Sequence, residues 1–290
     1  MSWRTVCITN RAKLDLRMNH LVVRSEDVVR IPISEIGVLI IDNTGCSFTC
    51  ALISELMKHK VKLIICDEKH NPCCETLQYY GAHDCSKSVR SQISWKKPVC
   101  LKVWTEIVAW KIKKQRDHLV MRNLDQASLL TTYLQQIELG DPTNREGHAA
   151  KVYFNALWGT NFSREQEHPI NAALNYGYAL LLSLFNKELV AAGYLTQIGI
   201  WHENQFNPFN FSSDLMEPFR PIIDYRVFDL RPREFGPSEK RTMIEIMRLQ
   251  VLIDGQRQYL PNAIRIYVKS VLDVLNESQN GSLAMYSDLL

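Results

Sequence analysis

The feature that most constrains the fold is a change of hydrophobic period near residue 99. Before it, apolar and polar residues alternate in the segments 6–8, 14–16 and 21–23, which is the pattern of strands with one buried face. After it, apolar residues recur at helical spacing, at Trp104, Ile107, Val108 and Ile112. We therefore predict an α+β chain with a small N-terminal β-rich, sandwich-like domain followed by a larger all-α domain.

Shorter patterns place the domain boundaries. Further β-rich runs are predicted at 28–33, 36–41 and 61–66, with one helix at 47–58. Later helices are predicted at 129–137, 143–158, 239–253 and 262–275, and a long helix or helix pair is predicted at 169–192. A length of 290 residues suits two domains. The predicted boundaries are 1–85 for the β-domain, 86–100 for a linker, 101–278 for the helical domain and 279–290 for a flexible tail.

The cysteines divide the chain in the same way, since all eight lie within the first 100 residues. The N-terminus lacks an apolar leader, and the longest apolar run, 178–185, is far shorter than a bilayer span. We therefore expect a cytoplasmic protein with reduced thiols.

One interpretation of the cysteine cluster is a zinc site, although paired CxxC spacing is missing. The candidate ligands are Cys66, Cys73, Cys74 and Cys85, with His70 and His83. Buried or incidental thiols are the simpler interpretation.

Charge is concentrated at the join of the two halves. The whole chain carries a net charge of only +3, but residues 87–122 contain ten basic residues against two acidic ones. Such a strip attracts phosphate backbones, whereas the alternative is a solvated helix face. The candidate DNA-binding cations in it are Lys102, Lys111, Lys113 and Lys114.

Three polar segments of the helical half could carry chemistry. In the first, Thr143 and Glu146 have the spacing of a capping box, which would give Glu146 a structural role. Gly147 directly after it weakens a helix start, and close approach of a ligand is one compensation. The second segment ends an apolar run at His202, which is either a satisfied core residue or a ligand.

The third segment places two carboxylates, Asp214 and Glu217, on one face of a short helix. Their repulsion needs a cation, either Arg220 three residues on or a divalent metal. A histidine and carboxylates on different elements suit Mg²⁺ or Mn²⁺ with phosphate oxygens as further ligands. Together with the basic strip, this set indicates metal-assisted phosphoryl transfer on a nucleic acid.

Long segments of the chain resemble one known family. They are "WRTVCITNRAKLDLRMNHLVV" (3–23), "LIICDEKHNP" (63–72), "TNREGHAAKVYFNALWG" (143–159), "HPINAALNYGYALLLS" (168–183) and "GYLTQIGIWHENQFNPFNFSSDLMEPFRPIID" (193–224). This chain resembles the CRISPR-associated protein 1 family, the integrase of spacer acquisition, and within it the type II subfamily, with II-A as the expected subtype.

The resemblance implies three catalytic metal ligands. They fall on Glu146, His202 and Glu217, where many relatives outside this subfamily carry aspartate at the last position. Asp214 is expected to support the ligands or to act as an occasional one. Arg145 and Arg220 are expected to hold phosphates. Asn171, Asn175 and Tyr176 lie in a matching motif and are given a supporting or DNA-contacting role.

The resemblance also implies the activity and the partners. The expected reaction is transesterification, in which 3′-hydroxyls of a short DNA fragment attack the CRISPR repeat, with DNA endonuclease activity from the same site. Mg²⁺ or Mn²⁺ is the expected cofactor. The expected partners are double-stranded DNA, a second copy of the chain, CRISPR-associated protein 2, the type II effector nuclease and an accessory acquisition protein. The alternatives are a catalytically silent DNA-binding scaffold and a general metal-dependent nuclease.

Overall fold

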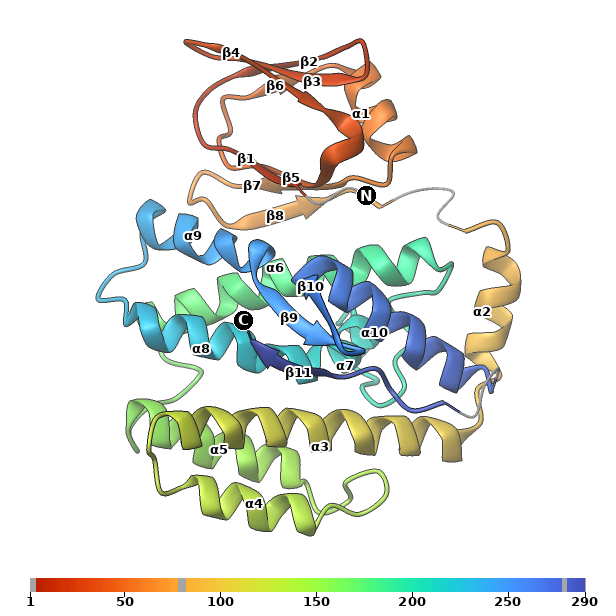
Figure 1. Ribbon diagram of the computed structural model, residues 1–290, viewed down its shortest axis with the longest axis vertical. Coiled ribbons are helices and arrows are strands. Elements are labelled where there is room, and N and C mark those ends of the chain that lie inside the picture. Colours follow the sequence, from red (N-terminus) through yellow and green to blue (C-terminus); the bar gives the residue numbers. More distant parts are fainter. Residues whose placement is uncertain (1–3, 78–81, 278–280, 290) are drawn as a thin grey trace. The chain divides into compact units, whose positions relative to one another are not determined.

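A computed structural model describes residues 4–77, 82–277 and 281–289 (Figure 1). The chain forms two compact units, Met1–His83 and Asp84–Leu290. Each is described by itself below. No helix in the described ranges is long and apolar enough to cross a membrane.

The first unit contains two four-stranded sheets. One sheet has the order β1-β5-β7-β8, with parallel pairs up to β7 and an antiparallel β8, and the other has the order β4-β3-β2-β6. The strands are β1 (Arg4–Ile8), β2 (Lys13–Arg17), β3 (His20–Arg24), β4 (Val28–Pro32), β5 (Ile36–Ile41), β6 (Ser47–Phe48), β7 (Lys62–Cys66) and β8 (Pro72–Glu75). A 3₁₀ turn, η1 (Ile33–Glu35), precedes β5, and one helix, α1 (Cys50–Lys58), follows β6.

Apolar side chains from both sheets and from α1 share one core. All six residues of β5 are buried, and this strand lies between β1 and β7 in its sheet. Leu14 and Leu21 from the other sheet and Leu52 from α1 complete the same core. The prediction of a β-rich N-terminal domain is confirmed.

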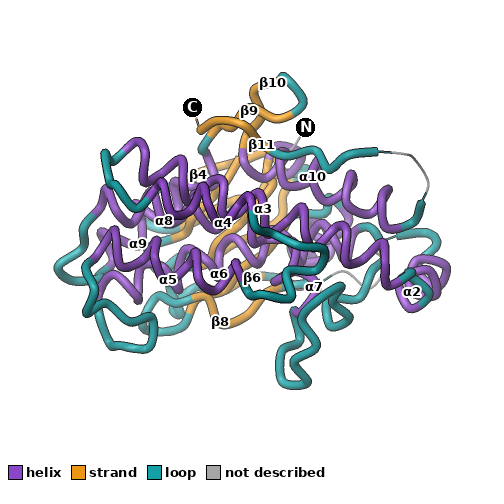
Figure 2. Tube along the Cα trace, turned by 90° about the horizontal axis from the view of Figure 1, so that it is seen from below, coloured by secondary structure: helices purple, strands orange, loops and turns teal. Residues whose placement is uncertain are grey.

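The second unit is helical in the main, as predicted. Its helices are α2 (Cys85–Ile93), α3 (Lys97–Met121), α4 (Ala127–Gln135), α5 (Arg145–Trp158), α6 (Pro169–Ala191), α7 (Asn210–Met216), α8 (Arg220–Leu230), α9 (Pro237–Ile244) and α10 (Leu260–Leu275), with 3₁₀ turns η2 (Glu217–Phe219) and η3 (Glu245–Arg248). Figure 1 shows α4 and α5 beside the long helix α3, and Figure 2 shows the packed helices from below.

Helix α3 is the central element of this unit because it is buried on several faces. Its buried residues include Trp104, Ile107 and Val108, and also Lys111 and Lys114. A surface helix keeps its lysines on the polar face. The burial of two lysines therefore indicates that α3 meets polar partners inside the unit.

The prediction of an all-α second unit is wrong, because a three-stranded sheet, β10-β9-β11, belongs to it. Its strands are β9 (Gln250–Ile253), β10 (Gln256–Tyr259) and β11 (Tyr286–Leu289). The helix predicted over 239–253 therefore ends early, and its last part is β9. The turn between β9 and β10 has positive φ at Asp254 and Gly255, which favours a tight hairpin.

Two boundary predictions also need correction. The segment 86–100, predicted as a linker, is mostly helical: it covers most of α2 and the first turn of α3, and only residues 94–96 lie between these helices. In the tail 279–290, residues 286–289 form β11, which pairs with β9 through Tyr286 and Leu289. Tyr286 is buried. The tail pattern is too short for periodicity to reveal a strand, and its partner strand lies more than 30 residues earlier.

Candidate active site

The start of helix α5 shows how Glu146 becomes available for chemistry. Asn144, with φ of 51°, accepts a hydrogen bond at its side chain from the backbone N–H of Gly147. The carboxylate of Asp141 accepts the N–H groups of Arg145 at 2.8 Å and Glu146 at 2.9 Å. These residues satisfy the helix start, so the capping-box interpretation of Thr143 and Glu146 is wrong.

Gly147 is explained by the same cap. A Cβ atom at this position would lie 2.7 Å from the side-chain nitrogen of Asn144. Glycine therefore leaves room for the capping side chain, and no ligand is needed to account for it.

Glu217 opens the 3₁₀ turn η2 between α7 and α8 and is only 4% exposed. Pro218 follows it in the first turn, where its missing N–H costs nothing. The hydroxyl of Tyr286, from the C-terminal strand, donates to the carbonyl of Pro218 at 3.0 Å. The tail thus fixes the turn that carries Glu217, a role that the sequence did not suggest.

Lys111 connects the two glutamates. Its Nζ donates to Oε1 of Glu146 at 2.6 Å and to Oε2 of Glu217 at 2.5 Å, while Nε of Arg220 donates to Oε1 of Glu217 at 2.8 Å. Burial raises the pKa of Glu217, but the charges of Arg220 and Lys111 outweigh it and lower that pKa to about 2. Burial likewise opposes the charge on Lys111, yet the two carboxylates raise its pKa. Lys111 and Glu217 are therefore both ionised at neutral pH.

Asp214 orients His202. Its Oδ1 accepts hydrogen bonds from Nδ1 of His202 and from the backbone N–H of the same residue, at 2.5 and 3.2 Å. Its Oδ2 accepts the N–H groups of Ile200 and Trp201, at 2.7 and 3.0 Å. With Nδ1 held by a carboxylate, Nε2 is the nitrogen left for a ligand, which is the usual arrangement behind a metal-binding histidine.

The pKa of His202 is raised, chiefly by its hydrogen bond with Asp214, although burial opposes the shift. The negative charges of Glu217 and Glu146 raise this pKa as well. The imidazole and both glutamates therefore act on one another electrostatically, although they come from three separate segments of the chain.

The loop that carries His202 is tightly packed. A Cβ at Gly199 would lie 2.5 Å from the carbonyl oxygen of His202 and 2.6 Å from Oδ2 of Asp214, so only glycine fits there. Trp104 of α3 stacks on Trp201 and meets the ring of His202 edge-on, with centroids 5.4 and 5.5 Å apart. The fold therefore holds His202 in one orientation before any ligand binds.

The donor chemistry fits a divalent cation. Two carboxylates converge on one positive group, and the charges of both act on an oriented imidazole, a set suited to Mg²⁺ or Mn²⁺. Within residues 4–77, 82–277 and 281–289, no three His, Cys, Asp or Glu side chains lie close enough together to hold a metal ion. The ammonium of Lys111 lies between the two carboxylates instead.

The motif residues of α6 have protein partners. Asn171 is 2% exposed, and its side chain bonds to Arg164 and to the carbonyls of Ser163 and Gln166. Arg164 also donates to Asn175 at 2.6 Å. Tyr176 is 3% exposed. This burial favours the supporting role over the DNA-contacting one for Asn171 and Tyr176.

The basic strip 87–122 is not one continuous surface. Lys111 and Lys114 are buried, and Lys114 donates to the carbonyl of Ser287. Lys113 lies over the ring of Trp110, with 4.2 Å to its centroid. The exposed cations lie in α2 and around the first turns of α3, at Lys87, Arg90, Lys96, Lys97 and Lys102. The lysines of the 25-residue helix α3 point in different directions around its axis. The count of basic residues in the sequence therefore overestimated the positive charge on any one surface.

The two predicted phosphate clamps have different protein partners. Arg220 pairs with Glu217, and its guanidinium lies 4.7 Å from the ring centroid of Tyr178. Arg145 lies over the ring of Tyr133 in α4, at 5.6 Å. Arg220 therefore already neutralises Glu217 structurally, as one interpretation of the sequence expected.

Asp224 was not predicted as a site residue. It is 1% exposed in α8 and accepts a hydrogen bond from the hydroxyl of Tyr178. Burial raises the pKa of Asp224 to about 6, against the effects of the Tyr178 hydrogen bond and of Arg164 and Arg220. Asp224 follows Glu217 by seven residues and ends the quoted motif at "PIID". Its place in that motif is the sequence feature that could have identified it as a site residue.

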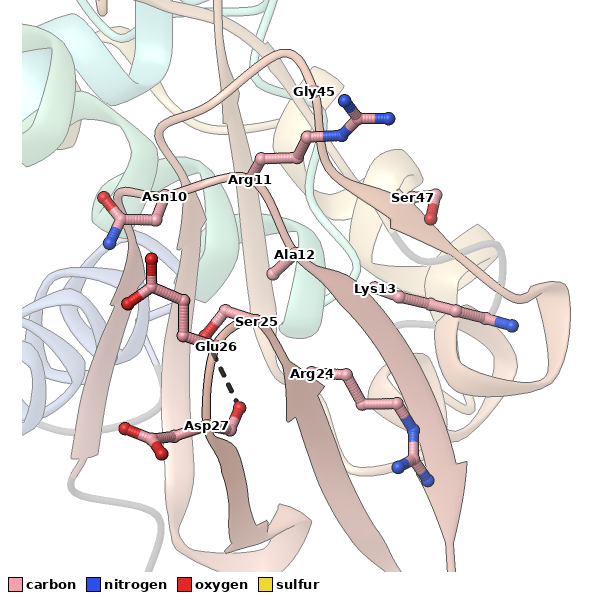
Figure 3. A pocket seen from close by; sticks show the side chains of 10 residues that line it. All are labelled: Asn10, Arg11, Ala12, Lys13, Arg24, Ser25, Glu26, Asp27, Gly45 and Ser47. Atoms are coloured by element: carbon pink, nitrogen blue, oxygen red, sulfur yellow. Dashed lines mark hydrogen bonds between the residues drawn. The ribbon is translucent and has the colours of Figure 1, made fainter.

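The first unit has a pocket of about 760 Å³ (Figure 3). Its walls carry cations at Arg11, Lys13 and Arg24 and carboxylates at Glu26 and Asp27. Arg24 is already paired with Asp15 at 3.0 Å. The mixed charge gives this pocket no defined ligand class.

The zinc interpretation gains no support in the described part of the chain. Cys66 is buried in β7, whereas Cys73 and Cys74 are exposed on β8. His70 bonds through Nδ1 to the carbonyl of Asp42. The described residues include no metal-binding group of three such side chains.

Known proteins resemble this chain over most of its length. The family described as "CRISPR associated protein Cas1" matches residues 6–241. A CRISPR-associated endonuclease Cas1 of Neisseria meningitidis serogroup C is 34% identical over 263 residues, covering 88% of this chain and 86% of that protein.

Solved structures share the fold. A casposase bound to its integration product has a TM-score of 0.77 at 19% identity, covering 96% of this chain and 92% of that one. A Cas6-RT-Cas1–Cas2 complex has a TM-score of 0.73 at 17% identity, covering 96% of this chain and 35% of that one. The matched family segment contains every candidate ligand.

Proposed function

The chain belongs to the family of CRISPR-associated protein Cas1, and we propose that it is an integrase of CRISPR spacer acquisition that also has DNA endonuclease activity. The observation that carries the proposal is the convergence of Glu146 and Glu217 on one cation, beside His202 held by Asp214. Within this family, type II-A is the proposed subtype.

Glu146, Glu217 and His202 would hold the metal. A bound Mg²⁺ or Mn²⁺ supplies a lowered pKa at the attacking 3′-hydroxyl and neutralises charge that develops on the phosphate. The cations next to Glu217 keep this carboxylate ionised, and Asp214 keeps the imidazole in one orientation. The protein thus presents charged donors in fixed positions, and it needs no covalent intermediate with the DNA.

The remaining residues position the substrate. The exposed cations of α2 and α3, such as Lys87, Lys97 and Lys102, would contact backbone phosphates without reading sequence. The reaction joins a 3′-oxygen to the attacked phosphorus as another 3′-oxygen leaves, and water in place of the hydroxyl gives cleavage. Double-stranded DNA, a second copy of the chain and CRISPR-associated protein 2 are the proposed partners, with the type II effector nuclease and an accessory acquisition protein in the larger assembly.

A strand-transfer assay tests this function. The protein and its CRISPR-associated protein 2 partner are incubated with a short duplex that carries 3′-hydroxyl ends and a plasmid that contains a CRISPR repeat. We expect joined products with Mg²⁺ or Mn²⁺, none in a chelator, and none from His202→Ala. Glu203→Gln, which alters an exposed carboxylate next to His202, is the matched control and should retain activity.

The same assay separates the alternatives. A catalytically silent scaffold would bind the duplex without joining or cutting it. A general nuclease would cut both DNAs equally well whether or not the plasmid carries a repeat. Normal strand transfer by His202→Ala, or full activity after confirmed metal removal, would contradict the proposed mechanism.

A further inference from the structure

The ammonium of Lys111 occupies the space between two proposed metal ligands. Its Nζ lies 2.6 Å from Glu146 and 2.5 Å from Glu217, and its side chain is only 10% exposed. Each distance is typical of a strong charge-assisted hydrogen bond. An ammonium and a divalent cation cannot both fill the gap between these oxygens.

Removal of the Lys111 charge would leave two carboxylates close together without the cation that neutralises them. Glu217 is 4% exposed and, among its described salt bridges, would keep the one to Arg220. A buried ion that loses its partner strongly destabilises the folded state. Lys111 therefore stabilises the protein in the absence of metal.

A divalent cation carries twice the charge of the ammonium and can coordinate the same carboxylate oxygens directly. Lys111 is held to the glutamates only by hydrogen bonds from its ammonium group. Its flexible four-carbon side chain can rotate away without backbone movement. We propose that Lys111 is a resident counter-cation that holds Glu146 and Glu217 until a divalent metal replaces it. This inference rests on the proposed function, because it takes these glutamates as the metal ligands.

The exchange makes two consequences measurable. Metal must compete with the ammonium, so the wild-type site binds metal more weakly than the same ligands would without Lys111. The displaced ammonium also becomes a donor beside the loaded site, where a DNA phosphate is the complementary partner. Metal binding and DNA binding should therefore strengthen each other.

The test measures Mn²⁺ binding to the purified full-length protein by the electron paramagnetic resonance signal of unbound Mn²⁺. Lys111→Met removes the ammonium but keeps a chain of similar length. We expect this variant to bind Mn²⁺ at least about tenfold more tightly than the wild type, since it has no competing charge. It should also melt at a lower temperature than the wild type in chelator and gain more from added Mn²⁺.

Two further variants keep the test decisive. Lys111→Gln retains an N–H donor for the glutamates, so it keeps the test available if Lys111→Met fails to fold, and it should show the same gain in affinity. Lys151→Met changes an exposed lysine of α5, the helix that carries Glu146, and should leave both the affinity and the melting temperature unchanged.

The outcomes separate this inference from the function beneath it. Unchanged or weaker Mn²⁺ binding by both Lys111 variants would overturn the exchange while leaving the metal site intact. If the wild type and both variants bind no Mn²⁺, the proposed metal-dependent function fails together with the inference.

Discussion

Asp214 and Glu217 are three residues apart in the chain and both are buried, yet they lie in two differently built regions of the site. Asp214 accepts hydrogen bonds from three backbone N–H groups and from His202. Glu217 is bonded to two side-chain cations, Lys111 and Arg220. The backbone donors cannot leave without unfolding the loop, whereas the side-chain cations can rotate away. The first carboxylate is therefore suited to positioning and the second to ligand exchange.

The largest effect should come from Glu217. Replacement by glutamine in Glu217→Gln removes a charged ligand, and we expect strand transfer to fall more than about a hundredfold, beyond the typical loss for a supporting residue. Binding of duplex DNA at low salt should change little. Residual strand transfer within tenfold of the wild type would remove Glu217 from the ligand set and weaken the comparison.

Asp224 sharpens the comparison because it is a buried carboxylate with no direct ion pair among the described contacts. Its pKa is raised to about 6 from an ordinary 3.8, so the folded state favours the protonated form. The stabilising contribution is complete below pH 3.8 and is lost as the pH rises through 6, a change of about 3 kcal/mol over that range.

The isosteric variant Asp224→Asn does not titrate. Its free energy of unfolding relative to the wild type should increase between pH 4 and pH 7, as measured by urea denaturation at each pH. A difference that stays constant over this range would show that Asp224 has an ordinary pKa.

Asp214→Asn should have an intermediate effect. It keeps one acceptor oxygen but no longer fixes Nδ1 of His202, so strand transfer should fall about 10–100-fold. It should also lower the free energy of unfolding by about 1–3 kcal/mol, because buried N–H groups lose their acceptor. The strand-transfer assay would measure the first effect, and urea denaturation would measure the second. Loss of activity with unchanged stability would assign Asp214 to the metal itself.

The smallest effect should come from the exposed cations. Lys102→Ala should weaken DNA binding uniformly across sequences and reduce the slope of log affinity against log salt by about one. Fluorescence anisotropy at several salt concentrations would measure the slope. Lys151→Ala, on α5, is the matched control, and an equal change in both variants would argue against a defined DNA path along α3.

The sequence predicted those parts of the fold that depend on local periodicity. Strand alternation before residue 99 and helical spacing after it located both units, and Pro169 marked the start of α6 correctly. The strands β9 and β11 were missed because their pairing is non-local. The hydrophobic pattern of a four-residue strand cannot be separated from that of a helix end.

The site was predicted in part for a similar reason. Asp214 and Glu217 are close in the chain, so their shared face could be inferred. The cap at Asp141 was missed because the Thr143 and Glu146 spacing offered a simpler local cap. Lys111 was assigned to a DNA-binding surface, and its contact with residues 35 and 106 positions away arises only from tertiary packing. Long-range ion pairs leave no mark on sequence periodicity.

A crystal of the protein soaked with Mn²⁺ would test the central claim most directly, through an anomalous difference map. We predict a peak bound by the carboxylates of Glu146 and Glu217 and by Nε2 of His202, at roughly 2.0–2.3 Å as is usual for such ligands, with Lys111 moved away from both glutamates. A fully soaked crystal with no peak there, in which Lys111 still bridges the two glutamates, would contradict the account.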